Sequence, residues 1–202
     1  MFTIIFPVLN ERLRLESGVT RTVEYLRKIA FEDYEIIIVD NGSEDETPQI
    51  AEMLCQKYEK VRYERINVRG VGAAFRRGVE LSHGDVVGYM DIDLSTNIKH
   101  LGEAIHLFET QPQIEYINGS RFARESDTKG RKWYRRITSQ GLLILLKLFL
   151  RMKSTDAICG FTFIRMISAP NSLITEIRIS SGPWWRSSVI SKRSLVILER
   201  SW

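Results

Sequence analysis

The chain has 202 residues, of which 44% are hydrophobic and 27% are charged, with a formal net charge of +4. This length and composition are typical of a globular protein with one well-buried domain, and they argue against a disordered chain. The mild net charge gives no reason to expect a nucleic-acid partner.

In chain order, short runs rich in Ile and Val alternate with longer helical patterns. The run at 35–39, EIIIV, has no polar alternation, which is typical of a strand covered on both faces. The expected strands are 2–6, 34–39, 61–66, 85–90 and 114–118. The expected helices are 19–30, 71–81, 98–109 and a helix that is capped by Ser43 or Asp45 and runs to about residue 58. This alternation predicts βαβ units and therefore an α/β fold class, with a mostly parallel sheet and helices on both faces.

The first segment, MFTIIFPVLNE, has no basic n-region and only a short apolar run. We therefore expect it to be a first strand and not a signal peptide or a membrane span. Cys55 and Cys159 have neither CxxC spacing nor a cluster of histidines around them, so they predict neither a zinc site nor a disulfide framework. A reducing, cytoplasmic location fits these features best.

Acidic side chains follow three of the predicted strands: Glu11, Asp40, and the pair Asp91 and Asp93. In a parallel sheet, ligands bind at this carboxyl edge, where the loops meet the helix starts. Like charges placed together oppose folding, so a bound cation or sugar hydroxyls would offset their repulsion.

The segment VVGYMDIDLS places Asp91 and Asp93 one residue apart at the end of a buried strand. Mg²⁺ and Mn²⁺ prefer carboxylate oxygens and complete their coordination with substrate phosphates and water. An Asp-x-Asp pair taken alone is more often two solvated acids in a turn, but its place after an apolar strand and downstream of Asp40 favours a metal. We therefore predict that this pair holds a divalent cation against a diphosphate.

Residues 69–74, RGVGAA, begin a predicted helix with two glycines. Backbone N–H groups at such a helix start can approach a phosphate or a nucleotide. The signal is weak, because the third glycine of the dinucleotide-binding fold is missing at its spacing. Gly78, inside the helix, is more consistent with close packing.

Taken in order along the chain, these segments resemble family 2 of the GT-A glycosyltransferases, especially the dolichyl-phosphate mannose and glucose synthases. The resemblance covers about residues 1–165. It is carried by IIFPVLNE, EIIIVDNGSEDET, RGVGAAFRRG, HGDVVGYMDIDLST, NGSR at 118–121 and DAICGF at 156–161. It implies a GT-A catalytic domain that moves a sugar, with inversion, from a UDP- or GDP-linked donor, and that depends on Mg²⁺ or Mn²⁺.

The resemblance also implies roles for particular residues. Asp91 and Asp93 would act at the metal and the donor, with Asp93 catalytic, and Arg121 would contact phosphate. Asp156 would lie near the sugar or the acceptor. The other residues implied to bind the donor are Pro7, Leu9, Glu11, Ile38 and Asp40 around the nucleoside, with Ile92 and Ser95 beside the metal pair.

The stretch 121–153 holds ten Lys or Arg against two acids, and it contains the apolar run 141–150. Arg131, Lys132, Arg135 and Arg136 could bind the acceptor phosphate and anionic headgroups, while the apolar run lies in the membrane interface. This favours a polyprenyl or dolichyl phosphate acceptor and a peripheral location on the cytoplasmic face of a membrane, with 129–153 as the interfacial segment. The alternative is a buried core helix with a solvated basic start.

The acceptor decides whether a general base is needed. A lipid phosphate is already ionised at neutral pH, whereas a saccharide or protein hydroxyl needs a carboxylate to take its proton, for which Asp156 is the candidate. Transfer to such a hydroxyl is therefore the alternative activity. A nucleotidyltransferase is not favoured, because the glycine-rich basic signature expected near its N-terminus is missing from IIFPVLNERLRLE.

The tail, 166–202, differs from the rest of the chain: it has nine serines, two acids and a Pro-Trp-Trp run with little period. We hypothesise that it comes from a truncated gene or a shifted reading frame. In that case the acceptor site would be incomplete, and the protein would be a nucleotide-sugar-binding remnant without turnover. Resequencing the locus tests this, because an unbroken frame coding the same tail would contradict the hypothesis.

Overall fold

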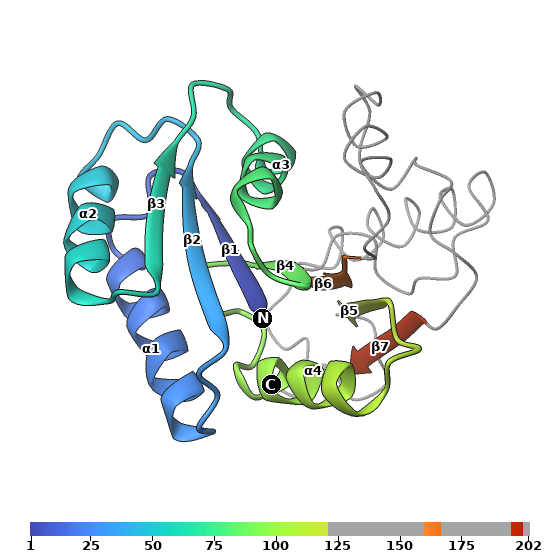
Figure 1. Ribbon diagram of the computed structural model, residues 1–202. Coiled ribbons are helices and arrows are strands. Elements are labelled where there is room, and N and C mark those ends of the chain that lie inside the picture. The colour runs from blue at the N-terminus through green and yellow to red at the C-terminus, as the bar shows by residue number, and fades with distance from the viewer. Residues whose placement is uncertain (121–159, 167–194, 200–202) are drawn as a thin grey trace, which may run out of the picture.

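The structure, a computed structural model, describes residues 1–120, 160–166 and 195–199 (Figure 1). Within these residues the helices are α1 (Leu15–Lys28), α2 (Thr47–Lys57), α3 (Val71–Leu81) and α4 (Lys99–Thr110). The strands are β1 (Phe2–Val8), β2 (Tyr34–Asp40), β3 (Val61–Arg65), β4 (Val86–Met90), β5 (Tyr116–Ser120), β6 (Phe161–Arg165) and β7 (Leu195–Glu199). The alternation of strand and helix up to β5 confirms the predicted α/β class.

The described strands form one sheet in the order β3-β2-β1-β4-β6-β5-β7. The first four strands pair in parallel, β6 runs antiparallel to both β4 and β5, and β7 pairs in parallel with β5. The sheet is therefore mostly parallel, as expected, with one reversed strand in its middle. Strand β7 comes from the tail 166–202, where no element was expected.

Alternate residues of the strands point to opposite faces of the sheet, and both faces are covered. Ile4, Phe6, Ile36 and Ile38 belong to a large core with the apolar sides of α1, α2 and α4. Ile5, Ile37, Val39 and Val87 pack on the other face against Ala74 and Phe75 of α3. In Figure 1, α3 accordingly lies across the sheet from α1 and α2. The fully buried β2 explains why its sequence shows no polar alternation.

The first two helices begin at other residues than expected from the sequence, whereas α3 spans the predicted 71–81. Helix α1 begins at Leu15, one turn earlier than predicted, and α2 begins at Thr47. Ser43 does not cap α2, because its hydroxyl donates to Asp40 at 2.6 Å. Asp45 instead accepts the N–H of Thr47 at 3.0 Å through its Oδ1 atom, just ahead of the helix. The competing partner of Ser43 is Asp40, three residues earlier at the end of β2.

None of the helices in the described ranges is long and apolar enough to cross a membrane. The basic and apolar segment 129–153 lies outside the described residues. The division into a domain 1–165 and a tail 166–202 stays a prediction.

Candidate functional site

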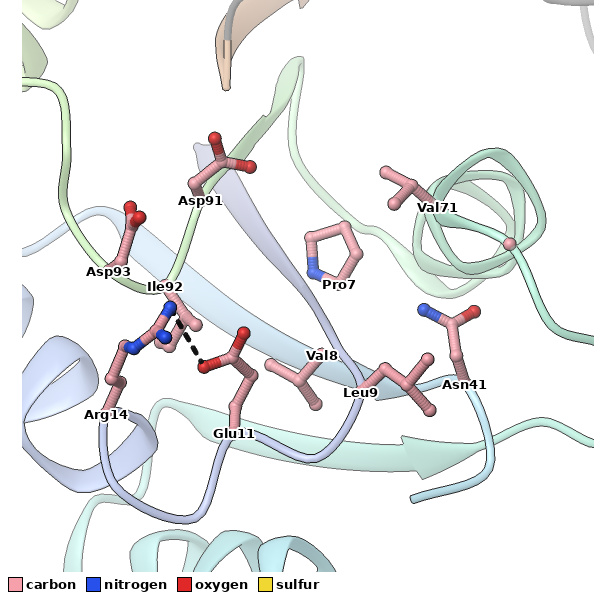
Figure 2. Close-up of a pocket in the computed structure, with 11 residues that line it drawn as sticks. Pro7, Val8, Leu9, Glu11, Arg14, Asn41, Val71, Asp91, Ile92 and Asp93 are labelled. Carbon is pink, nitrogen blue, oxygen red and sulfur yellow. Dashed lines mark ion pairs between the residues drawn. The ribbon is translucent and has the colours of Figure 1, made fainter. Parts of the chain in front are cut away.

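A pocket of about 290 Å³ lies at the carboxyl ends of β1, β2 and β4, beside the start of α3. This is the edge of the sheet at which the sequence placed the ligand. The pocket is lined by Pro7, Val8, Leu9, Glu11, Arg14, Asn41, Gly70, Val71, Asp91, Ile92 and Asp93 (Figure 2).

Three acids from two loops line this pocket: Glu11 after β1, and Asp91 and Asp93 after β4. Glu11 forms an ion pair with Arg14 at 3.6 Å. Burial nonetheless raises the pKa of Glu11, and the negative charges of Asp93 and Asp91 add to this effect. The pocket is thus negatively charged on this side, and a cation bound there would relieve the repulsion.

The loop that carries Asp91 and Asp93 is a tight turn. The N–H of Leu94 donates to the carbonyl of Asp91 at 3.0 Å, and Leu94 has a φ of 49°, which is unfavourable for a branched side chain. Such a conformation costs on the order of 1–3 kcal/mol and persists where the surroundings enforce it. Ser95 donates its N–H to Asp93 Oδ1 at 2.8 Å, so its backbone orients that carboxylate.

The residues present fit a divalent cation. Asp91 and Asp93 are exposed carboxylates in one pocket, and hard cations prefer such oxygen ligands. Within the described part of the chain, no group of three His, Cys, Asp or Glu residues is arranged to hold a metal. Mg²⁺ is usually bound through one or two carboxylates together with substrate phosphates and water.

The start of α3 forms part of the pocket wall. Gly70 has a φ of 135°, a backbone conformation that L side chains rarely adopt, and a Cβ placed there would meet open space. The glycine is thus explained by the backbone path into the helix. Among the described residues no side chain caps this helix start. Its N–H groups and dipole favour an anion in the pocket.

Asn41 was not identified from the sequence, although it lines the pocket directly after β2. Its side chain is buried, and Oδ1 has no hydrogen-bond partner among the described residues. A buried acceptor without a donor is costly, which makes a ligand N–H or O–H a natural partner. Both residues belong to the motif VDNGS, but only the acid, Asp40, was predicted from the sequence to bind a ligand.

Asp40 is fully buried and does not line the pocket. It accepts the N–H of Ser43 at 2.8 Å, the hydroxyl of Ser43 at 2.6 Å and the hydroxyl of Tyr63 at 2.9 Å. Arg65 lies 4.0 Å from the same carboxylate. Burial, followed by the hydrogen bond to Asp40, raises the pKa of Tyr63 to about 12.

The network around Asp40 also holds the loop after β1. Ser43 accepts the N–H of Asn10 at 2.9 Å, and Asn10 accepts the N–H of Glu44 at 2.9 Å. Asn10 has a φ of 55°, a conformation that Asn tolerates better than most residues. The loop that presents Glu11 is therefore fixed by the loop after β2.

The structure brings together six of the residues proposed from the sequence. Pro7, Leu9, Glu11, Asp91, Ile92 and Asp93 all line the pocket. Ile38 lies in the core and does not reach the pocket, and Ser95 is half-buried behind Asp93. Arg121, Arg136 and Asp156 lie outside the described residues. The ligands that these residues bind stay predictions.

Comparison with known proteins adds an independent line of evidence. The family model described as glycosyl transferase family 2 matches residues 3–170. Glycosyltransferase AglD of Haloferax volcanii is 32% identical over 161 residues, which cover 79% of this chain and 26% of that protein. The dolichyl-phosphate beta-glucosyltransferase of Mus musculus is 32% identical over 174 residues, covering 80% of this chain and 54% of that protein. The chain thus spans about a quarter and about half of the lengths of these two relatives.

Among solved structures, the chain is similar to glucosyl-3-phosphoglycerate synthase from Mycobacterium tuberculosis in complex with Mn²⁺, uridine diphosphate and glucosyl-3-phosphoglycerate. The TM-score is 0.55 at 21% identity, and the match covers 82% of this chain and 57% of that chain. At this identity the likeness shows the fold.

Proposed function

This chain belongs to glycosyl transferase family 2 and has the GT-A fold, and we propose that it transfers a sugar from a UDP- or GDP-linked donor to a polyprenyl or dolichyl phosphate. The observation that carries the proposal is the shared pocket of Asp91, Asp93, Asn41 and the start of α3. These groups supply the chemistry that a nucleotide diphosphate needs: a cation site, a hydrogen-bond acceptor and a helix start that favours anions.

The donor is proposed to lie along the carboxyl edge of the sheet. Asp91 and Asp93 would hold Mg²⁺ or Mn²⁺, which neutralises negative charge on the diphosphate as it departs. The start of α3 would stabilise the same phosphates through its N–H groups and dipole. Mn²⁺ in the similar Mycobacterium tuberculosis structure supports this assignment of a divalent metal.

The nucleoside would occupy the end of the pocket formed by Pro7, Leu9 and Asn41. Leu9 is 39% exposed and offers an apolar surface beside the buried Asn41 amide. A base ring buries apolar area against such a side chain, while its N–H groups can donate to the Asn41 oxygen, for which the described ranges hold no donor. Glu11, on the same loop as Leu9, is proposed to accept a hydrogen bond from a ribose hydroxyl.

The proposed acceptor follows from the dolichyl-phosphate transferase of Mus musculus, whose name states its lipid substrate. An ionised lipid phosphate attacks without a general base. The described pocket therefore needs no additional carboxylate to take up a proton in this step. Arg121, Arg136 and Asp156 are proposed to act on the acceptor side. A protein that uses a lipid acceptor would work at a membrane surface, and we propose peripheral attachment on the cytoplasmic face through 129–153.

The test is incubation of the purified protein with Mn²⁺ or Mg²⁺ and a panel of UDP- and GDP-sugars, with and without polyprenyl phosphate. We expect nucleotide release that requires both the metal and the lipid phosphate. Release with a saccharide or protein acceptor in place of the lipid would instead assign a hydroxyl acceptor. Metal-dependent nucleotide binding without release under any condition would identify a binding protein without turnover.

A further inference from the structure

Gly160 lies directly before β6 and faces the loop that carries the proposed metal ligands. The N–H of Asp91 donates to the carbonyl of Gly160 at 2.9 Å, continuing the antiparallel pairing of Met90 with Phe161. Asp91, directly after β4, is thus fixed to a residue 69 positions later in the chain. Gly160 is buried, whereas Asp91 is exposed to the pocket.

A side chain at residue 160 would overlap the Asp91 carboxyl group. The three atoms nearest to a Cβ placed on Gly160 are Oδ2, Cγ and Oδ1 of Asp91. The backbone of Gly160 is not in the left-handed region, since the described glycines with positive φ are Gly42 and Gly70. Space for the carboxylate, and not the path of the chain, therefore accounts for glycine at this position.

The effect of a methyl group on a glycine depends on whether its nearest atoms belong to the backbone or to a side chain. At Gly88, on the same pair of strands, a Cβ would meet the backbone carbonyl of Thr162, so the strands themselves would have to move. At Gly160 the atoms in the way are the end of an exposed side chain, which can rotate toward solvent into another staggered rotamer. The change would then appear mainly in the position of the carboxylate.

From these contacts we infer that Gly160 is a positioning residue that sets the side-chain rotamer of Asp91 and thereby its place in the metal site. The inference rests on the proposed function in assigning a metal to Asp91. Residues that orient a metal ligand typically change metal affinity by about 10- to 100-fold when they are substituted. The three atoms nearest to such a methyl group all belong to Asp91 and none to Asp93.

The test compares Gly160→Ala with Gly102→Ala. Gly102 lies on α4, outside the pocket, and a Cβ there would also meet the end of a side chain, the hydroxyl of Tyr25. Mn²⁺ is titrated calorimetrically into each full-length protein in the presence of UDP, and metal-free melting temperatures are recorded. We expect Gly160→Ala to weaken Mn²⁺ binding at least about tenfold, with Gly102→Ala like the wild type.

A metal-free crystal structure of Gly160→Ala provides the second readout. We expect a displaced Asp91 carboxylate on an otherwise unchanged sheet. An unmoved carboxylate, or wild-type Mn²⁺ affinity, would overturn the inference. If the wild type binds no metal and nucleotide, the proposed function fails, while the position of Asp91 in the metal-free variant still decides whether Gly160 sets it.

A double variant covers the case in which Gly160→Ala does not fold. Asp91→Ala with Gly160→Ala removes the carboxyl group, whose atoms are the three nearest to the added methyl group. Recovery of folding in the double variant would show that the conflict is with the Asp91 side chain. Failure of both variants to fold would place the conflict elsewhere and overturn the inference.

Discussion

The hydroxyl of Tyr63 on β3 donates to the carboxylate of Asp40 at 2.9 Å, and this carboxylate is fully buried at the end of β2. The bond joins the edge strand to the centre of the loop network beside the pocket. Because a buried carboxylate needs its donors, the Tyr63 hydroxyl is expected to stabilise the fold as well as the loop after β1.

Tyr63→Phe removes this donor and leaves one Asp40 oxygen with fewer partners. We expect the free energy of unfolding at pH 7 to fall by about 1–3 kcal/mol, measured by urea titration. Tyr58→Phe is the matched control, since the Tyr58 hydroxyl donates to the neutral Thr20 hydroxyl, at 3.3 Å. An equal loss in both variants would contradict a special role for the Asp40 contact.

The same pair predicts a change at alkaline pH. The pKa of Tyr63 is raised from 10.0 to about 12, so the folded state holds this proton more tightly than the unfolded state. Its contribution is complete below pH 10 and is lost as the pH rises toward 12. The stability difference between the wild type and Tyr63→Phe should therefore narrow over this range, whereas a constant difference would contradict the raised pKa.

Glu11→Gln tests whether the negative charge of the partly buried Glu11 carboxylate destabilises the fold. The pKa of Glu11 is raised above 4.5, chiefly by burial, so the wild type loses stability as the pH rises from 4.5 through the folded-state pKa. Glutamine stays neutral, and we expect the variant to gain stability relative to the wild type over this window and to be the more stable at pH 7. Urea titrations at several pH values measure the difference.

Glu46→Gln is the control with the opposite sign. The hydrogen bond from Arg12 lowers the pKa of Glu46, so its contribution is present above pH 4.5 and is lost as the pH falls through the folded-state pKa. This variant should be slightly less stable than the wild type at pH 7, with the gap closing in acid. A Glu11→Gln variant that behaves like Glu46→Gln would contradict the raised pKa of Glu11.

Asn41→Leu separates ligand binding from stability. Because the Asn41 oxygen is buried and has no hydrogen-bond partner in the described part of the chain, leucine should leave the melting temperature unchanged or raise it. UDP or GDP binding, measured calorimetrically with Mn²⁺, should weaken by about tenfold, the value of one lost hydrogen bond.

Asn118→Leu provides the contrast for Asn41. The Asn118 oxygen accepts the buried Thr162 hydroxyl at 2.8 Å, so the same substitution there should lower the melting temperature by leaving that hydroxyl without its acceptor. Tight nucleotide binding by Asn41→Leu would remove Asn41 from the site.

Asp93→Asn tests the proposed metal site most directly. We expect metal-dependent binding of the donor to fall more than about a hundredfold, because the loss of a ligand exceeds the usual effect of a residue behind it. The fold should remain intact, since Asp93 is exposed and asparagine keeps an oxygen for the N–H of Ser95. Asp45→Asn, outside the pocket, is the control, and unchanged affinity in Asp93→Asn would contradict the assignment.

The sequence alone determined the α/β class and the edge of the sheet that carries the pocket. Runs such as EIIIV at 35–39 and the helical periods between them are local properties, so they can be identified without distant contacts. The same holds for Glu11, Asp91 and Asp93, because residues that directly follow parallel strands meet at one edge.

Only the tertiary structure decided how these residues are supported. Asp40, predicted to lie at the nucleoside, is enclosed by Tyr63 and Ser43. Asn41 was not predicted as a site residue, and its oxygen has no hydrogen-bond partner among the described residues. The reversed strand β6 brings Gly160 against Asp91. Whether a polar group is satisfied, or a side chain has room, depends on atoms far away in the sequence, and these contacts exist only once the sheet has assembled.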